Sequence, residues 1–498
     1  MVNHVKNVVI VGGGTAGWIT ASLLKRILKN HIQITLIESD EIGTVGVGEA
    51  SIPPMVNFNH ALGIGEQEFI KKTKATYKLG IEFEGWGDPS NNYMHAFGEL
   101  GKSFPFCDFS HIWLRAHKLG LSEAISEFSL NTQAAKSSKF AHLKTIPNTQ
   151  LTGLTYAYHF DAGLYAQLLS EHSQAQGVKR VEGKVVKVNS CHMSGNITSV
   201  ELHSGHQHNA DFFIDCSGLK GLLIEQTLNV GFEDWAHWLP CDSAWAVPCE
   251  HSAQEILPYT KSMAQTAGWQ WQIPLQHRVG NGYVFSSKFI DEQTAKNNLL
   301  EQLPAKPISE PKLIKFKTGM RRKQWHQNVF AIGLSSGFLE PLESTSIHLI
   351  QTAALRLIKH FPYEGISQAA VDAANAEFEQ EMVQVRDFII LHYKLTQRTD
   401  TEFWRWCKRM EVPESVSKKI ALFSETGSCP VKTEELFQSV AWQQVMLGQG
   451  IMPKGYHPLA EQLDEAQLKS LLESLKTLIE TTVDKLPSHS VFVNKVVS

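Results

Sequence analysis

The sequence lacks the features that mark several specialised classes of protein. Its 46 lysines and arginines nearly balance its 50 acidic residues, and no block of like charges occurs, so nothing indicates a nucleic-acid partner. No uncharged apolar run approaches the roughly 18 residues that cross a bilayer. The seven cysteines include no C-x-x-C pair, which argues against a disulfide framework and against a zinc ribbon. We expect reduced thiols, no metal site, no membrane partner and a cytoplasmic location.

Internal repeats and low-complexity segments are absent as well, so no flexible linker divides the 498 residues. Helical patterns dominate after about residue 366. We therefore expect an α/β body over residues 1–365, with interleaved substrate-binding segments near 90–155 and 235–310. A mainly helical C-terminal region, residues 366–498, is expected to cover the substrate site.

The N-terminal residues have the pattern of a βαβ unit. Asn7–Val11 (NVVIV) is typical of a buried strand and is followed by a glycine turn at Gly12–Gly17. Apolar positions then recur on one face of a helix over Trp18–Leu28, and Ile32–Glu38 (IQITLIE) has the pattern of the next strand. Because the strand pattern begins within a few residues of Met1, we expect no signal peptide.

The glycine turn contains the spacing Gly12-x-Gly14-x-x-Gly17, with an acidic residue, Glu38, at the end of the second strand. Glycines let the backbone turn tightly and approach a pyrophosphate, the helix N-terminus offers N–H groups, and Glu38 can accept hydrogen bonds from ribose hydroxyls. The alternative is a glycine turn with only a structural role. The strand, the turn, the helix and the acidic residue all occur at the positions that the fingerprint requires, so we predict a dinucleotide site.

FAD fits this site better than NAD. The sequence has one such fingerprint, at its N-terminal end, and later strand patterns at Asp211–Cys216 and Asn328–Gly333 are those that close an FAD domain. A hairpin is expected from Lys184–Ser190 and Ile197–Leu202. The predicted fold class is α/β: a Rossmann-like FAD-binding body of the glutathione-reductase or p-hydroxybenzoate-hydroxylase type, with an interleaved substrate sheet and a helical C-terminal region.

Several further motifs occur together with the glycine turn, and they are spread over most of the first 350 residues. They are GGGTAGW at Gly12–Trp18, GVGEASIP at Gly46–Pro53, the segment TYKLGIEFEGW around Lys78, HAFG at His95–Gly98, GWQWQIP at Gly268–Pro274 and EPLEST at Glu340–Thr345. In this order they resemble the flavin-dependent tryptophan halogenases. W-x-W-x-I-P is the signature that separates these enzymes from ordinary flavin monooxygenases.

The resemblance implies a reaction and its cofactors. Reduced FAD from a separate flavin reductase, O2 and a halide ion, chloride or bromide, yield hypohalous acid, which moves through a tunnel to a lysine beside an aromatic substrate. By resemblance this lysine is Lys78, whose ammonium or amine can hold the acid in a dry environment. The alternative is a solvated surface lysine such as the nearby Lys71.

Two positions in EPLEST correspond to functional residues of the family. Glu343 matches an essential glutamate that orients the oxidant and takes the proton from the ring; its alternative role is that of an acid at a helix N-terminus. The halide site is implied at the backbone N–H groups of Thr345 and Ser346, since a helix N-terminus binds anions. Ser346 replaces the usual glycine, and its Cβ restricts the backbone there. Ser and Thr hydroxyls here also predict a helix cap. Glu340 is expected to be structural.

The resemblance also implies residues around the flavin and the substrate. Trp269 and Trp271 of the signature motif, which also includes Ile273 and Pro274, would wall the flavin pocket, although plain core packing is the alternative. His95 and Phe97 would line the aromatic substrate site, where stacking holds a flat ring; a core histidine is the alternative for His95. Besides the fingerprint residues, the expected FAD contacts are Thr15, Ala16, Ser39, Gly48, Ala50, Val186, Leu334 and Ile347.

The substrate is where the sequence departs most from the family. Tryptophan halogenases hold the amino-acid head with a Phe-Trp pair and adjacent tyrosines, but the matching segment Glu435–Gly450 has only Phe437 and Trp442. We therefore predict indole or an indole derivative rather than free tryptophan. A single-component aromatic hydroxylase is the alternative function, and a homologue without turnover is a third. The sequence leaves a homodimer open.

Overall fold

The computed structural model describes residues 4–41, 48–122, 124–252 and 255–498. The chain divides into two compact units, each made of three separate segments. Unit 1 comprises residues 1–75, 160–242 and 315–383, and unit 2 comprises residues 76–159, 243–314 and 384–498. All seven cysteines lie in the described part, and none of them forms a disulfide there. In the same described residues, no helix combines the length and the apolar character needed to span a membrane.

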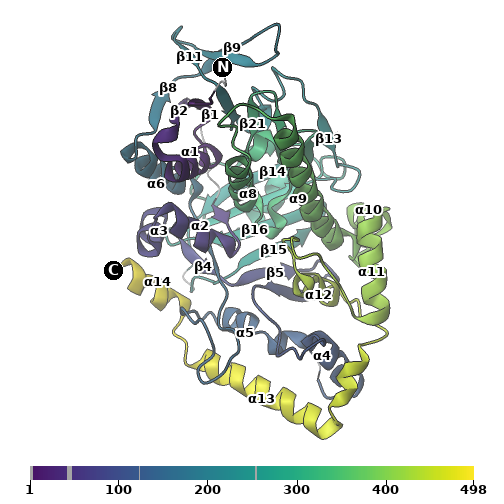
Figure 1. The fold of residues 1–498 in the computed structure, drawn as a ribbon. Coiled ribbons are helices and arrows are strands. Elements are labelled where there is room, and N and C mark those ends of the chain that lie inside the picture. The colour runs from purple at the N-terminus through teal and green to yellow at the C-terminus, as the bar shows by residue number, and fades with distance from the viewer. Residues whose placement is uncertain (1–3, 42–47, 123, 253–254) are drawn as a thin grey trace. The chain divides into compact units, whose positions relative to one another are not determined.

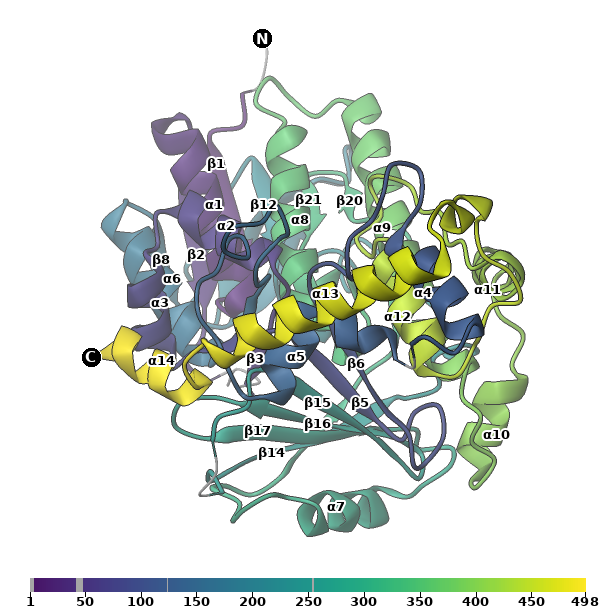
Figure 2. The same ribbon diagram turned by 90° about the horizontal axis from the view of Figure 1, so that it is seen from below.

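Unit 1 contains a six-stranded sheet in the order β20-β21-β12-β1-β2-β8, part of which is labelled in Figure 1 and all of which is labelled in Figure 2. Its strands pair in parallel from β21 to β8, and only β20 is antiparallel to its neighbour. The predicted βαβ opening is confirmed. The bounds are β1 Asn7–Val11, β2 Gln33–Glu38, β8 Lys179–Glu182, β12 Phe212–Asp215, β20 Trp325–His326 and β21 Val329–Ala331.

Helices and a small sheet pack against the strands of unit 1. Helix α1 (Thr15–Leu28) contacts α6 (Ala162–Ala175) and α8 (Ser346–Lys359). The predicted hairpin is confirmed as β9 (Val185–Ser190) paired with β10 (Ile197–Leu202). Apolar residues of β10 share a buried cluster with residues of β1, β12 and β21, so this small sheet helps to close the core. The other elements are β3 Glu49–Ala50, α2 Pro54–Leu62, α3 Glu66–Thr73, β11 Gln207–Asn209, β13 Phe232–Asp234, β19 Gly319–Arg321 and β22 Gly337–Phe338.

Unit 2 is built on a seven-stranded sheet in the order β18-β14-β17-β16-β15-β5-β6, with α7 (Glu292–Glu301) packed on one face (Figure 2). Strands β14, β17, β16 and β15 pair in antiparallel fashion, and β15 and β5 are parallel. The bounds are β5 Gly80–Glu84, β6 Asn92–Ala96, β14 Ser243–Cys249, β15 Thr260–Gln265, β16 Gly268–Pro274, β17 Val279–Phe285 and β18 Lys312–Lys315. A short strand, β4 (Thr76–Lys78), pairs with β7 (Ala157–Phe160).

The last part of the chain is mainly helical, as the sequence predicts. Helix α9 (Gln368–Lys394) begins in unit 1 and ends in unit 2. Within unit 2, α13 (Glu465–Asp484) runs across α5 (Leu130–Lys136) and α4 (Phe109–Lys118) (Figure 2). Its start is fixed by a capping box, in which Asp464 and Gln467 bond each other's backbone N–H groups. The remaining helices are α10 Glu402–Arg409, α11 Glu414–Thr426, α12 Ser439–Gly448 and α14 His489–Val497.

The pH dependence of folding stability has an identifiable contribution from Glu49, in β3. Burial raises the pKa of this carboxyl group from 4.5 to about 7. Between these two pH values the folded protein keeps a proton that the unfolded chain has lost, so stability falls as the pH rises through this window. We predict that Glu49→Gln is about 3 kcal/mol more stable than the parent above pH 7, and equally stable below pH 4.5.

Urea unfolding of the parent and the variant at several pH values checks this prediction. The exposed Glu41 provides the control, because Glu41→Gln should leave the pH profile unchanged. A constant stability difference between parent and Glu49→Gln across the pH range would contradict it.

Candidate active site

The glycine turn of unit 1 has the geometry that a dinucleotide requires. Gly12 has a φ of 115°, and a Cβ there would lie 2.2 Å from the carbonyl oxygen of Cys216. A Cβ at Gly17 would lie 1.9 Å from the carbonyl oxygen of Gly12, so only glycine permits this close contact of helix and turn. A Cβ at Gly14 would meet no atom within 4 Å, which leaves room for a pyrophosphate. These residues fit FAD.

Helix α1 begins directly at this turn. Gly14 is its N-cap and contributes no side-chain bond, so the N–H groups of the first turn, which includes Thr15 and Ala16, point toward the open side. Glu38 accepts a hydrogen bond from Trp18 Nε1 (3.3 Å) and forms an ion pair with Arg180. A carboxylate has about four acceptor positions, so Glu38 keeps capacity for ribose hydroxyls. Arg180 was not found from the sequence, because it lies far along the chain.

Other residues expected to contact FAD also lie in unit 1. A Cβ at Gly333 would lie 2.9 Å from the Cβ of Ala16, which places the turn that carries Leu334 against α1. Leu334 is 39% exposed, whereas Ile347, in the first turn of α8, is buried. Val186 on β9 is 53% exposed and therefore accessible to a ligand.

The remaining expected FAD contacts border the part of the chain outside the described residues. Ser39 follows β2 directly, and Gly48 and Ala50 begin the next described segment. Gly46 and Val47 of the GVGEASIP motif lie outside the described residues. Ser39, Gly48 and Ala50 stay predictions as FAD contacts.

The segment EPLEST forms a tight buried turn before α8. A short 3-10 helix spans Pro341–Glu343, and Ser344 then takes a left-handed conformation with a φ of 59°. Glu343 is only 2% exposed. The helix starts at Ser346, but the Thr345 side chain makes no cap bond, so the predicted hydroxyl cap is wrong. The Thr345 hydroxyl therefore does not compete with an anion for the first-turn N–H groups of α8.

Ser346 does not carry the backbone restriction expected from the loss of glycine. It is the first residue of α8, and the left-handed residue of the turn is Ser344, two positions earlier. A Cβ is strained in the left-handed region and is ordinary in a helix. The serine at 346 is thus compatible with a backbone halide site.

Lys78 is fully buried in unit 2, with 0% exposure, at the end of β4. Its Nζ lies 5.3 Å from the centroid of the Phe97 ring, within the range of a cation–π contact. Phe97 is held there because its N–H donates to the carbonyl of Leu79 (2.9 Å). The alternative of a solvated surface lysine is wrong.

An aromatic cluster surrounds His95 in unit 2. The His95 ring makes an edge contact with Phe388 (5.6 Å between centroids), and Phe388 stacks on Phe437 at 3.9 Å. Trp442 meets Phe388 edge-on at 5.1 Å. Gln444 of α12 bonds both the N–H and the C=O of the residue between His95 and Phe97, each at 3.1 Å. Sequence reasoning missed Phe388 and Gln444, because an apolar helical run and a lone glutamine carry no local signal.

The signature tryptophans lie on β16, in the interior of unit 2. Trp269 is 6.4 Å from Trp86 and 6.1 Å from Trp271, measured between ring centroids. Gly282 faces Trp271 across the strand pair, and a Cβ there would lie 2.1 Å from the Trp271 ring. Core packing is therefore part of what these residues do. Their role in walling a flavin pocket stays a prediction.

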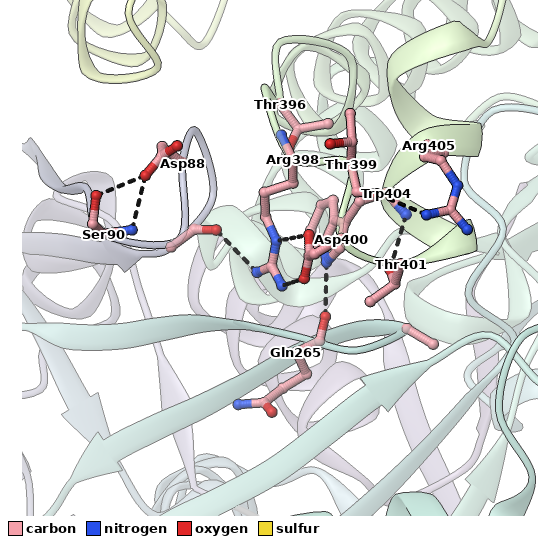
Figure 3. A network of polar contacts seen from close by, with 12 residues as sticks. Asp88, Ser90, Gln265, Thr396, Arg398, Thr399, Asp400, Thr401, Trp404 and Arg405 are labelled. Carbon is pink, nitrogen blue, oxygen red and sulfur yellow. Dashed lines mark hydrogen bonds and ion pairs between the residues drawn. The ribbon is translucent and has the colours of Figure 1, made fainter.

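The chain does contain one Phe-Trp dipeptide, at Phe403 and Trp404 in α10, but it serves a structural network (Figure 3). Trp404 Nε1 donates to the carbonyl of Gln265 at 2.8 Å, and the Arg398 guanidinium lies 4.9 Å from the Trp404 ring. Arg398 is itself paired with Asp400. The Trp404 indole N–H, Arg398 and Asp400 are thus engaged within the protein.

Comparison with known proteins gives the family. A family model described as tryptophan halogenase matches residues 7–465. The tryptophan 6-halogenase SttH of Streptomyces toxytricini is 34% identical over 508 residues, which covers 97% of this chain and 96% of that protein.

Two solved structures are similar over nearly their whole length. A flavin-dependent halogenase from Xanthomonas campestris has 44% identity and a TM-score of 0.96, and 99% of each chain is covered. The flavin-dependent halogenase BrvH from Brevundimonas sp. BAL3 has 41% identity and a TM-score of 0.95, again with 99% of each chain covered. The predicted α/β fold with a helical C-terminal region is confirmed. The chain belongs to the flavin-dependent tryptophan halogenase family and is a flavin-dependent halogenase.

Proposed function

We propose that this halogenase attaches chloride or bromide to an indole or an indole derivative, and that free tryptophan is a poorer substrate. The observation that carries the proposal is Lys78, an amine buried beside the Phe97 ring in the unit that also holds the aromatic cluster around His95. Reduced FAD from a separate reductase would, when bound, give two electrons to O2, and the halide would give the other two, so that hypohalous acid, water and oxidised FAD are formed.

Lys78 is the residue we assign to holding the oxidant. In a site from which water is excluded, an ammonium group polarises a hypohalous acid far more effectively than it would in solution, because little solvent screens the charge. The ring of Phe97 limits the positions that the lysine side chain can adopt. The amine would therefore present the halogen in one direction, which is what regioselective attack on an aromatic ring requires.

Glu343 is the residue we assign to proton transfer. Electrophilic attack on an aromatic carbon leaves a cationic ring that must lose a proton to regain aromaticity, and a carboxylate is a suitable acceptor. The turn that carries Glu343 is followed by the uncapped N-terminus of α8, where the N–H groups of Thr345 and Ser346 would bind halide.

The charges next to the aromatic cluster support a substrate without an amino-acid head. A bound tryptophan brings a carboxylate and an ammonium, both of which need partners when they leave water. Lys419, whose Nζ lies 4.1 Å from the Trp442 ring centroid, already forms an ion pair with Glu435. Neither side chain is available for a substrate charge unless that pair breaks.

The role of Lys78 is tested by removing its amine. We predict that Lys78→Ala and Lys78→Met lower product formation at least about hundredfold, the cost of losing one donor to the transition state. Mass spectrometry of indole incubated with enzyme, flavin reductase, O2 and bromide measures the yield. Lys71→Met, at an exposed position, is the control and should retain activity. Full activity of Lys78→Met would show that the amine is dispensable.

The substrate assignment is tested with a graded set of indoles. We predict the order indole, then tryptamine and indole-3-propionate, then tryptophan, because a charge on the substrate would have to break the Lys419–Glu435 ion pair to gain either partner. Values of kcat/KM for the four compounds, measured with one reductase and one halide, check this order. A higher kcat/KM for tryptophan than for indole would overturn the assignment.

The halide site is tested at Ser346. Because the proposed donors are backbone N–H groups and residue 346 is helical, we predict that Ser346→Gly and Ser346→Ala change the KM for chloride and bromide by less than about threefold, a shift within the usual helix-propensity range. Steady-state rates at varied halide concentration give these values. A tenfold gain in chloride affinity in Ser346→Gly alone would mean that the family's glycine is needed there.

A further inference from the structure

The strand that carries Lys78 is short and has unusual support from two buried histidines of unit 2. β4 has three residues, and His159 of β7 lies opposite Thr76 in the antiparallel register. Side chains two residues apart on a strand share a face, so Thr76 and Lys78 lie on the same face of β4. Opposite Lys78 the partner residue is Ala157, which leaves space for the lysine stem. His159 has no exposed surface.

A hydrogen-bond chain of fixed direction runs through His159. Thr76 Oγ1 lies 2.7 Å from the carbonyl of Pro274, and a carbonyl only accepts, so the Thr76 hydroxyl donates there. Its oxygen then accepts from His159 Nδ1, at 3.1 Å. The other ring nitrogen, Nε2, lies 2.9 Å from the Thr260 hydroxyl, which donates to a neutral ring. The chain thus runs from Thr260 through His159 and Thr76 to Pro274.

The neutral form of His159 agrees with its surroundings. Burial lowers the pKa of His159 well below 6.5, and the positive charge of Lys78 lowers it further. A protonated ring beside Lys78 would place two cations together away from water. The neutral ring with its proton on Nδ1 satisfies both hydroxyls without that cost.

His489 holds the residue between Thr76 and Lys78 in the same manner. Its Nδ1 lies 2.8 Å from the carbonyl of Ile256, and its Nε2 accepts from the N–H of Tyr77 at 3.1 Å. Burial lowers the pKa of His489 to about 4, so this ring is also neutral near pH 7. Both residues that precede Lys78 are therefore fixed by imidazoles.

Pro274 connects this arrangement to the family signature, because it is the last residue of the GWQWQIP segment on β16. Its carbonyl is the end point of the hydrogen-bond chain. A lysine side chain has four rotatable bonds, so its amine is placed reproducibly only when the backbone beneath it is rigid. An error of about 1 Å at a reacting group costs on the order of a hundredfold in rate.

We propose that His159 is a positioning residue of this halogenase, which places the Lys78 amine by tying β4 to Thr260 and to the signature segment at Pro274. The inference rests on the role of Lys78 proposed above. It assigns to the Ile-Pro end of the signature a function separate from that of its tryptophans.

The test compares His159→Phe with His159→Gln in the full-length enzyme with FAD, reductase, O2, bromide and indole. Phenylalanine fills the space without hydrogen bonds, whereas the glutamine amide offers an NH2 group that donates and a carbonyl oxygen that accepts. We expect His159→Phe to lower kcat about ten- to a hundredfold, with the KM for indole and the affinity for FAD nearly unchanged. A water-soluble halogen acceptor added to the reaction should capture more oxidant per turnover. His159→Gln should recover most of kcat and return the captured oxidant toward the parent level.

Each outcome decides the proposal. If His159→Phe keeps kcat, or loses kcat without increased capture of oxidant, His159 is not a positioning residue. If this variant does not fold, Thr76→Val, which removes the hydroxyl while keeping the side-chain shape, must give the same signature for the proposal to stand. The role of Lys78 is judged separately: if Lys78→Met is fully active, the proposed function fails whatever the His159 variants do.

Discussion

The burial of the Lys78 amine is the constraint that the neighbouring groups of unit 2 have to satisfy. Removing an ammonium group from water costs several kcal/mol unless nearby groups compensate. The ring of Phe97 contacts this side chain, and two buried histidines hold the two residues that precede it on β4. A solvated lysine would need none of this support. The structure around Lys78 is therefore better explained by a requirement for a dry, fixed amine than by folding alone.

The sites proposed in unit 1 use backbone N–H groups, whereas the site proposed in unit 2 uses a buried charged side chain. Under the proposed function unit 1 would bind two anions, a pyrophosphate and a halide, through backbone N–H groups at the starts of α1 and α8. Neither helix start has a side-chain cap, and a capping hydroxyl would compete with an anion for the same donors. The lack of a cap at Thr345, within a run of three hydroxyl residues, is thus consistent with a site kept open for a ligand.

Much of this architecture was predictable because its signals are local. The strands around the glycine turn, the hairpin of β9 and β10 and the helical C-terminal part follow from periodicity and turn residues. Phe388, Arg180 and His159 were not found, since each acts through a residue distant in sequence. The hydroxyl cap failed for a related reason: Ser344 takes the left-handed position, so the turn ends differently from a standard N-cap. Local rules describe elements, and long-range contacts decide which side chains meet.

The buried imidazoles of His159 and His489 are neutral, so neither adds a positive charge beside Lys78. There is a chemical reason for avoiding a second positive charge there. A lysine that holds an electrophilic oxidant has to be the dominant positive charge near it, because a second cation would compete for the same oxygen and would weaken the first by repulsion. Serine or glutamine in place of His159 would also be neutral, but serine is too short to bridge two hydroxyls. Histidine offers a rigid ring with one donor and one acceptor, and its burial keeps it uncharged. In many proteins the two ring nitrogens of histidine carry protons. In this protein the same two nitrogens let a neutral ring join two hydroxyl groups.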